Sequence, residues 1–182
     1  MILLTTSRRP TERIRTFCRD LANSIPDAVR VNRGKMSLDG VAEKAIEVEA
    51  DKVVVVDRWQ GGPGRINLYK LSNGLESVPP LMMIRGIRLR REFEKVKKRG
   101  QSSAITFAPE NSSALENIAG QLSHFFGLPV HSLDDASEKH VAAMHLSFDR
   151  SGCLQLTFRR LQRMVEIGPR VTLSKLIWDV SS

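Results

Sequence analysis

Three short apolar runs separated by two amphipathic segments dominate the opening part of the chain. The runs Ile2 to Thr6, Ala28 to Val31 and Lys52 to Asp57 predict strands, and the third contains the uninterrupted valine row typical of a buried strand. Between these runs, apolar residues recur at helical spacing. This β-α-β-α-β order predicts an α/β fold whose sheet contains parallel strand pairs.

The two segments between the strands predict helices with one apolar face each. The face of the first consists of Ile14, Phe17, Cys18 and Leu21. Pro10 suits its first turn, because an N–H there has no intrahelical partner, and the helix ends before Pro26. The second runs from Leu38 to Val48 after an N-cap at Ser37. Its inward face is expected to consist of Val41, Ala42, Ala45 and Ile46.

An antiparallel extension is expected next. The turn Gly61 to Gly64 leads into a strand from Arg65 to Leu71, and a turn at Ser72 to Gly74 leads into a long strand from Leu81 to about Arg91. The segment Glu92 to Gly100 is rich in charge and is interpreted as a linker that ends the first half.

The remainder of the chain resembles its beginning at a shift of 101 positions, which takes Leu4 to Ile105 and Thr5 to Thr106. The apolar face of the first helix is kept at this shift, but the arginines around it are not. We therefore expect two structurally similar α/β halves, residues 1–100 and 101–182, that arose by internal duplication and pack as one domain. Further elements expected in the second half are a strand near Leu128 to His131, a helix from Ala136 to Met144, strands at 145–149, 153–160, 163–168 and 170–179, and a hairpin turn at Asp149 to Gly152.

Positive charge is concentrated in the first half. Residues 1–100 contain 21 basic and 12 acidic residues, a net charge of +9, whereas residues 101–182 contain 7 and 8, a net charge of −1. A polyanion is the partner that such a field attracts, and nucleic acid is favoured over acidic lipid because the sequence shows no amphipathic membrane helix. The alternative is a scaffold whose near-neutral half docks a protein, with RNA contact incidental.

A first basic cluster surrounds the start of the first helix and consists of Ser7, Arg8, Arg9, Pro10 and Arg13. Cations at a helix N-terminus oppose its dipole, and Arg9 and Arg13 form a like-charged i,i+4 pair. A bound phosphate would relieve both costs. The alternative is a solvated cluster that is balanced by nearby acidic residues.

Two further clusters are candidate RNA contacts. The second follows a predicted strand and consists of Arg30, Asn32, Arg33, Gly34 and Lys35. Gly34 permits positive φ, and loops at the carboxyl ends of parallel strands converge, so this loop and the first cluster are expected to share a surface. The third, Arg88 and Arg90, is expected on a solvated strand face. The alternatives are an ordinary turn for the second cluster and protection of a sheet edge for the third.

Signals for catalysis are weak. The chain contains neither a P-loop nor a dinucleotide fingerprint, its four histidines lack metal-binding spacing, and Cys18 and Cys153 are expected to be buried reduced thiols. Asp57 at a strand end is an isolated candidate, which leaves a metal-dependent nuclease as a weaker alternative. We expect no enzyme activity, cofactor, metal or small-molecule substrate.

The chain resembles the Brix-domain family over nearly its whole length, and three segments carry the resemblance. They are Thr5 to Pro10, Arg30 to Leu38, and Glu166 to Arg170. The chain is most similar to compact archaeal members, which resemble a eukaryotic Brix protein of the small-subunit processome. It lacks the long charged extensions common in eukaryotic members.

The resemblance implies a function in ribosome biogenesis, with rRNA or pre-rRNA as the partner during small-subunit assembly, and ribosomal or pre-ribosomal proteins as further partners. It implies that each half is similar to the anticodon-binding domain of class IIa aminoacyl-tRNA synthetases. By position, the family elements fall on Ser7, Arg8 and Pro10, on Asn32, Arg33 and Gly34, and on Gly168, Pro169 and Arg170. The last of these elements is interpreted as an architectural turn. We expect the protein in the cytoplasm, or in the nucleolus if the source is eukaryotic. With few aromatics, recognition is expected to depend on RNA shape and phosphates.

Overall fold

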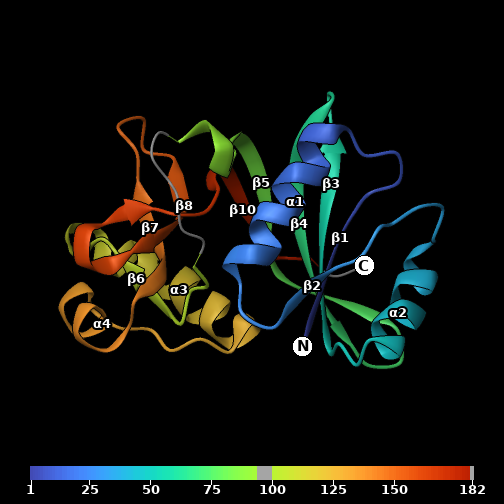
Figure 1. Ribbon diagram of the computed structural model, residues 1–182, viewed down its shortest axis with the longest axis horizontal. Helices are drawn as coiled ribbons and strands as arrows, with labels where there is room; N and C mark the ends of the chain where they lie inside the picture. Colours follow the sequence, from blue (N-terminus) through green and yellow to red (C-terminus); the bar gives the residue numbers. More distant parts are fainter. Residues whose placement is uncertain (94–99, 181–182) are drawn as a thin grey trace. The chain divides into compact units, whose positions relative to one another are not determined.

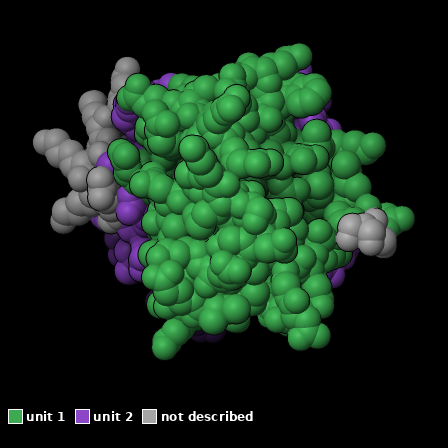
Figure 2. Space-filling view, turned by 90° about the vertical axis from the view of Figure 1, so that its right-hand side faces the viewer, with its two compact units in different colours: residues 1–22, 27–84, 175–182 green, residues 23–26, 85–174 purple. Residues whose placement is uncertain are grey.

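The computed structural model describes residues 1–93 and 100–180, and the chain divides into two compact units. Unit 1 comprises residues 1–22, 27–84 and 175–182, and unit 2 comprises residues 23–26 and 85–174; the segments of each are coloured in Figure 2. The longest segments of the two units meet at residues 84 and 85, and the chain returns to unit 1 at residue 175. None of the helices in the described ranges is long and apolar enough to cross a membrane.

Unit 1 is built on a sheet with the strand order β2-β1-β3-β4-β5. These strands are β1 (Ile2–Thr6), β2 (Ala28–Arg30), β3 (Lys52–Trp59), β4 (Gly62–Leu71) and β5 (Leu75–Arg88), the last of which continues into unit 2. The strand β1 pairs in parallel with both β2 and β3, and the following pairs are antiparallel. The predicted α/β class with parallel pairs is confirmed.

The helices α1 (Glu12–Ser24) and α2 (Leu38–Glu47) cover opposite faces of this sheet (Figure 1). The strand order explains why. The chain moves outward from β1 to β2 and then back past β1 to β3, and right-handed crossovers in opposite directions place their helices on opposite faces.

Both helix starts depend on a side-chain hydroxyl. The Ser37 hydroxyl accepts from the backbone N–H of Gly40 at 3.1 Å, so the predicted N-cap is confirmed. Pro10, in contrast, lies outside α1, whose first turn is capped by Thr11 through a 3.4 Å bond from the N–H of Ile14.

The two helices bury their apolar stripes as expected, with one exception. Ile14, Phe17, Cys18 and Leu21 of α1 are at most 3% exposed. Burial raises the pKa of the Cys18 thiol to about 12. On the other face, Val41 and Ala45 of α2 pack with Leu3, Val53 and Val55. The prediction for Ile46 is wrong: it is 65% exposed, because α2 packs through the neighbouring side of the helix.

The β3–β4 hairpin differs in detail from the prediction. The strand β3 continues to Trp59, and the turn consists of Gln60 and Gly61, whose φ values of 46° and 85° fit a two-residue turn with positive φ at both positions. The strand β5 begins at Leu75 rather than Leu81, and its register against β4 shifts near Pro79 and Pro80. Prolines are tolerated there because a bulge removes the need for their missing N–H groups.

In unit 2 the strands follow the order β10-β8-β7-β6, and a short β9 pairs with β8. The elements of this unit are η1 (Arg90–Glu92), β6 (Ala104–Phe107), η2 (Pro109–Asn111), α3 (Ser112–Phe126), α4 (Leu133–Lys139), β7 (Ala142–Phe148), β8 (Leu154–Arg160), η3 (Leu161–Arg163), β9 (Val165–Glu166) and β10 (Arg170–Ile177), which ends in unit 1. As in unit 1, a parallel pair, β6 with β7, is followed by an antiparallel strand.

Several boundaries in the second half are corrected. The helix expected from Ala136 to Met144 ends at Lys139, because the apolar residues after Val141 belong to β7. The strand expected near Leu128 to His131 is reduced to a bridge between Val130 and Ile105. Cys153 is only half-buried and accepts from Arg85 Nη1 at 3.0 Å. Most of the predicted charged linker lies outside the described residues.

Candidate nucleic-acid interface

The carboxyl ends of β1, β2 and β3 bring two of the predicted loops together. Backbone bonds tie β2 to β1, with the N–H of Val31 donating to the oxygen of Leu4 at 2.9 Å. Arg33 Nη1, from the loop after β2, donates to the backbone oxygen of Thr6 at 3.3 Å. The loop 7–10 begins directly after that residue, so the two loops lie side by side.

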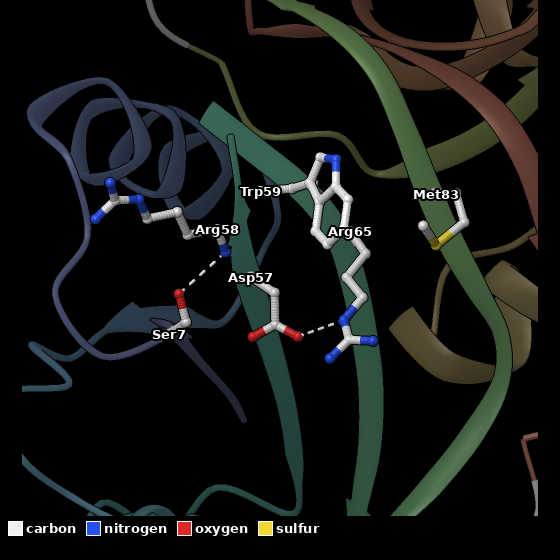
Figure 3. A pocket seen from close by; sticks show the side chains of 7 residues that line it. Ser7, Asp57, Arg58, Trp59, Arg65 and Met83 are labelled. Carbon is white, nitrogen blue, oxygen red and sulfur yellow. Dashed lines mark hydrogen bonds and ion pairs between the residues drawn. The ribbon is translucent and has the colours of Figure 1, made fainter. Parts of the chain in front are cut away.

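Backbone bonds hold the first of these loops, residues 7–10, against the end of β3. The Ser7 N–H donates to the oxygen of Val56 at 2.9 Å, and the Ser7 hydroxyl accepts from the Arg58 N–H at 3.0 Å (Figure 3). Arg9 has a φ of 55°, and its oxygen accepts from Arg58 Nη1 at 3.2 Å. The side chains of Arg8 and Arg9 are exposed. The loop is therefore fixed while its two guanidinium groups face solvent.

Beyond this loop, the start of α1 carries further arginines. Arg15 Nη1 donates to the oxygen of Pro10 at 3.0 Å, which ties the loop to the helix. Arg13 is half-buried, whereas Arg15 is exposed. The cluster predicted around the helix start thus consists of exposed and partly buried members.

The second loop is organised by Arg33, which is only 7% exposed. Its Nε donates to the oxygen of Met36 at 2.7 Å. Burial lowers the pKa of Arg33, and the positive charge of Arg8 acts in the same direction, whereas Asp57 opposes both. Arg33 therefore supports the loop from inside, and little of its surface is open to a ligand.

The remaining residues of this loop are more accessible. Arg30, which is half-buried, donates to the Asn32 side chain, and Gly34 has a φ of +54° that only glycine adopts at low cost. Asn32, Gly34 and Lys35 are exposed. The open turn therefore presents backbone groups and one ammonium group beside the first loop.

The sequence interpretation missed two arginines of this region, Arg58 and Arg65. Asp57 Oδ2 accepts from Arg65 Nε at 2.6 Å and from Asn67 Nδ2 at 2.8 Å. The Arg65 side chain remains 51% exposed. This contact was predictable from the sequence only by pairing Asp57 with Arg65 across the β3–β4 hairpin. We call the surface formed by Arg8, Arg9, Asn32, Gly34, Lys35, Arg58 and Arg65 the strand-end surface.

Asp57, the candidate catalytic residue, thus forms an ion pair and a second hydrogen bond on the same oxygen. Within residues 1–93 and 100–180, no group of three or more histidine, cysteine or acidic side chains is arranged to hold a metal ion.

A pocket of about 430 Å³ opens at the edge of the strand-end surface (Figure 3). Its lining includes Ser7, Asp57, Arg58 and Arg65 together with the apolar side chains of Trp59 and Met83. Trp59 is 70% exposed. This exposed aromatic was not anticipated, because the sequence interpretation ended β3 at Asp57.

The third predicted cluster belongs to unit 2. Arg88 is exposed, donates from Nε and Nη2 to the Glu92 oxygen at 3.2 and 2.8 Å, and lies 4.5 Å from the centre of the Phe93 ring. Arg90 is half-buried in η1. The expectation of two arginines on one solvated strand face is therefore wrong for Arg90, because the strand ends before it.

The segment Glu166 to Arg170 also lies in unit 2, between β9 and β10. Arg170 Nε donates to Glu166 Oε1 at 2.8 Å. A side chain at Gly168 would come within 2.8 Å of the Phe158 Cβ. These contacts support the architectural interpretation of this turn.

Net charge does not separate the two units. Unit 1 contains 14 basic and 11 acidic residues, a net charge of +3, and unit 2 contains 14 and 9, a net charge of +5, because residues 85–99 belong to unit 2. The distinction of unit 1 is therefore local: its exposed arginines gather at one end of its strands.

The chain is similar to known proteins both in sequence and in structure. No family model matches the chain. A probable Brix domain-containing ribosomal biogenesis protein of Aeropyrum pernix is 42% identical over 91 residues, which span 49% of this chain and 50% of that protein. The protein of the same description from Methanopyrus kandleri is 29% identical over 176 residues, 91% of this chain and 89% of that protein.

Solved structures extend the similarity over nearly the whole chain. The crystal structure of a probable ribosomal biogenesis protein from Aeropyrum pernix has a TM-score of 0.77 and 28% identity, and it covers 97% of this chain and 98% of that one. The archaeal Imp4-like protein Mil shares the fold, with a TM-score of 0.66, 24% identity and the same coverage. Over nearly its whole length, the chain is therefore similar to archaeal proteins described as probable Brix domain-containing ribosomal biogenesis proteins.

Proposed function

We propose that this protein is a non-enzymatic ribosome biogenesis factor that binds rRNA or pre-rRNA, in the cytoplasm, through the strand-end surface of unit 1. The observation that carries the proposal is the loop 7–10. Its backbone is bonded to β3, while the guanidinium groups of Arg8 and Arg9 face solvent at the start of α1.

This arrangement suits phosphate for two physical reasons. Guanidinium groups donate in pairs to phosphate oxygens, and the α1 N-terminus adds partial positive charge to the same place. Holding several cations together is costly without an anion, and Arg8 already lowers the pKa of Arg33. A phosphate backbone bound among these cations would attract each of them and so offset their mutual repulsion.

We assign different roles to the predicted contact residues. Arg8, Arg9 and Lys35 are exposed and are proposed to contact phosphates, and Ser7, Pro10, Arg30, Asn32 and Gly34 shape the loops that present them. Arg33 supports the second loop from within. Arg88 and Arg90, in unit 2, are proposed as secondary contacts. Small-subunit assembly is the step that we infer for the bound rRNA.

We also infer that the two units arose by internal duplication. Both contain a parallel pair followed by an antiparallel strand, and the 101-position shift places Thr5 of β1 on Thr106 of β6. Superposition of each unit on a class IIa anticodon-binding domain is expected to align these elements in order.

The test is a salt titration of RNA binding with Arg8→Ala/Arg9→Asn. Asparagine tolerates the positive φ at position 9. With a small-subunit rRNA transcript as the probe, we expect about 100-fold weaker binding at low salt, and a salt slope reduced by about 1.4 to 1.8 for two lost phosphate contacts.

A matched control removes two charges from the other end of the same strands. Lys52 and Lys70 are paired across β3 and β4, and Lys52→Ala/Lys70→Ala is expected to leave the affinity within about threefold. Equal losses in both double variants would indicate a diffuse electrostatic effect. An unchanged affinity and slope in Arg8→Ala/Arg9→Asn would refute the site.

A further inference from the structure

The indole of Trp59 is the most unusual surface feature of the strand-end region. It is 70% exposed, the largest exposed fraction among the large hydrophobic residues in the described part of the chain. Most exposed apolar residues are scattered singly and have no special meaning. Trp59 differs because Gly64 lets the next strand approach its backbone closely, and because its side chain lines a pocket.

In the hairpin that carries Trp59, the two strands approach each other closely at this residue. Trp59 pairs with Gly62 across the two-residue turn of Gln60 and Gly61. The register then shifts, which leaves Gly64 as the extra residue of a bulge in β4. A Cβ at Gly64 would lie 2.2 Å from the Trp59 Cβ, so only glycine permits the tryptophan backbone to approach β4 this closely.

The pocket beside the indole has a polar floor and apolar sides. Asp57, Arg65 and Met83 are successive partners across β3, β4 and β5, so their side chains share one face of the sheet. Figure 3 shows Trp59, Arg65 and Met83 on this side, whereas Arg58 leaves β3 on the other side. The volume of about 430 Å³ falls within the range typical of small-molecule sites, roughly 300–1,000 Å³.

The chemistry of the pocket matches a nucleobase. An indole face stacks on any base, and the floor offers both a guanidinium donor and a carboxylate acceptor to a base edge. Cations outnumber anions in its lining, because Arg58 and Arg65 accompany the single carboxylate of Asp57, which is paired with Arg65. An RNA backbone held by Arg8 and Arg9 would lie next to Ser7, which lines the pocket itself.

We propose that Trp59 stacks on an unpaired base of the bound RNA, with Met83 closing the pocket and Arg65 reaching the base edge. This inference rests on the proposed RNA binding, and it adds recognition of an unpaired base to the phosphate contacts expected from the sequence. A base inside a duplex cannot enter, because its faces are already stacked. The site therefore selects single-stranded or bulged RNA.

The experiment compares Trp59→Ala with Trp178→Ala, which removes the other tryptophan of the chain. Trp178 is 40% exposed and lies outside the pocket lining. The probes are a 20-nucleotide mixed-sequence single-stranded RNA and the duplex with its complement. Trp59→Ala is expected to weaken single-strand binding about 5-fold to 150-fold, and Trp59→Phe to restore most of it. Duplex binding and the salt slope should not change, and Trp178→Ala should behave as the wild type.

Fluorescence gives a direct readout of stacking. In a Trp178→Phe background, the emission comes from Trp59 alone, and the single-stranded probe is expected to quench it while the duplex leaves it unchanged. Wild-type affinity in Trp59→Ala, together with weakened binding in Arg8→Ala/Arg9→Asn, would overturn the stacking site and leave the proposed function intact. If neither RNA bound the wild type with salt-dependent affinity, the proposed function itself would fail.

Discussion

Both units contain a parallel strand pair followed by an antiparallel strand, but the residues that follow β1 and β6 differ in charge. After β1 come Ser7, Arg8, Arg9 and Pro10, and the 101-position shift places Ala108, Pro109, Glu110 and Asn111 after β6. Two arginines in one unit correspond to a proline and a glutamate in the other. A shared framework therefore does not imply a shared function, because loops at strand ends determine which ligand each unit can meet.

The interiors of the two units also differ at one equivalent position. The Thr5 residue of β1 pairs with Val55 of β3, whereas Thr106 of β6 pairs with His145 of β7. His145 is 5% exposed, and its Nδ1 lies 2.9 Å from the Thr106 hydroxyl oxygen. Unit 1 has an aliphatic side chain where unit 2 has a titratable one.

The largest effect is therefore expected from acid, and it should fall on unit 2. Burial, with a smaller contribution from the positive charge of Arg159, lowers the pKa of His145 to about 4, and Glu110 opposes the shift. Between this value and the usual 6.5, the unfolded chain binds a proton that the folded chain excludes. Unfolding free energy should thus decrease by up to about 3 kcal/mol as the pH falls through this window.

Denaturant titrations at pH 7, 5.5 and 4.5 measure this loss, and hydrogen exchange assigns it to β6 and β7 or to β1 and β3. His145→Gln keeps a partner for Thr106 and removes the titration. A wild-type pH profile in this variant, or equal acid loosening of β1, would contradict the assignment to His145.

The two hairpins should respond differently to the same substitution. Gly64→Ala places a methyl group against Trp59 and is expected to cost about 2 kcal/mol and to shift the Trp59 emission. Gly152, in the β7–β8 turn, has a φ of 76° and open space around it, so Gly152→Ala should cost only about 1 kcal/mol of backbone strain. Urea denaturation measures both costs, and a milder effect at Gly64 would show that the hairpin does not depend on that approach.

Arg33 separates structural support from ligand contact within unit 1. Because its guanidinium is bonded to the backbone oxygens of Thr6 and Met36, Arg33→Met should lower the unfolding free energy by about 1.5 kcal/mol. The salt slope of rRNA binding should change by less than half a phosphate contact, about 0.4. A stable variant with a clearly smaller slope would instead make Arg33 a direct phosphate contact, as the sequence interpretation had it.

Sequence periodicity predicted the order of the helices and strands in unit 1 because clear turns separate most of them. It failed where the apolar spacing of a helix continues into the following strand. The residues Ala142 to Met144 continue the apolar spacing of α4 but form the start of β7, since parallel pairing with β6 outweighs local helical preference. The prolines at the start of β5 concealed a strand for a similar reason, because only the partner strand reveals the bulge.

The candidate site was predictable only as far as charge and strand order reach. The meeting of the loops after β1 and β2 follows from the parallel sheet, but the burial of Arg33 depends on carbonyl groups that the sequence does not position. Trp59 was missed because its importance comes from contacts across the hairpin: the bulge at Gly64 and the row of Arg65 and Met83.

The smallest effect is expected from an attempt to make unit 2 resemble unit 1. Glu110 is exposed after β6, and Glu110→Arg reverses its charge. Rigidly presented guanidinium groups at a helix start should outweigh a lone surface charge, so rRNA affinity is expected to rise by about threefold at most at low salt and to return to the wild-type value near 0.5 M salt. Glu116→Arg, on the exposed side of α3, controls for charge alone. A gain at Glu110 that matched the loss in Arg8→Ala/Arg9→Asn would mean that charge, and not the bonded loop of unit 1, distinguishes the two strand ends.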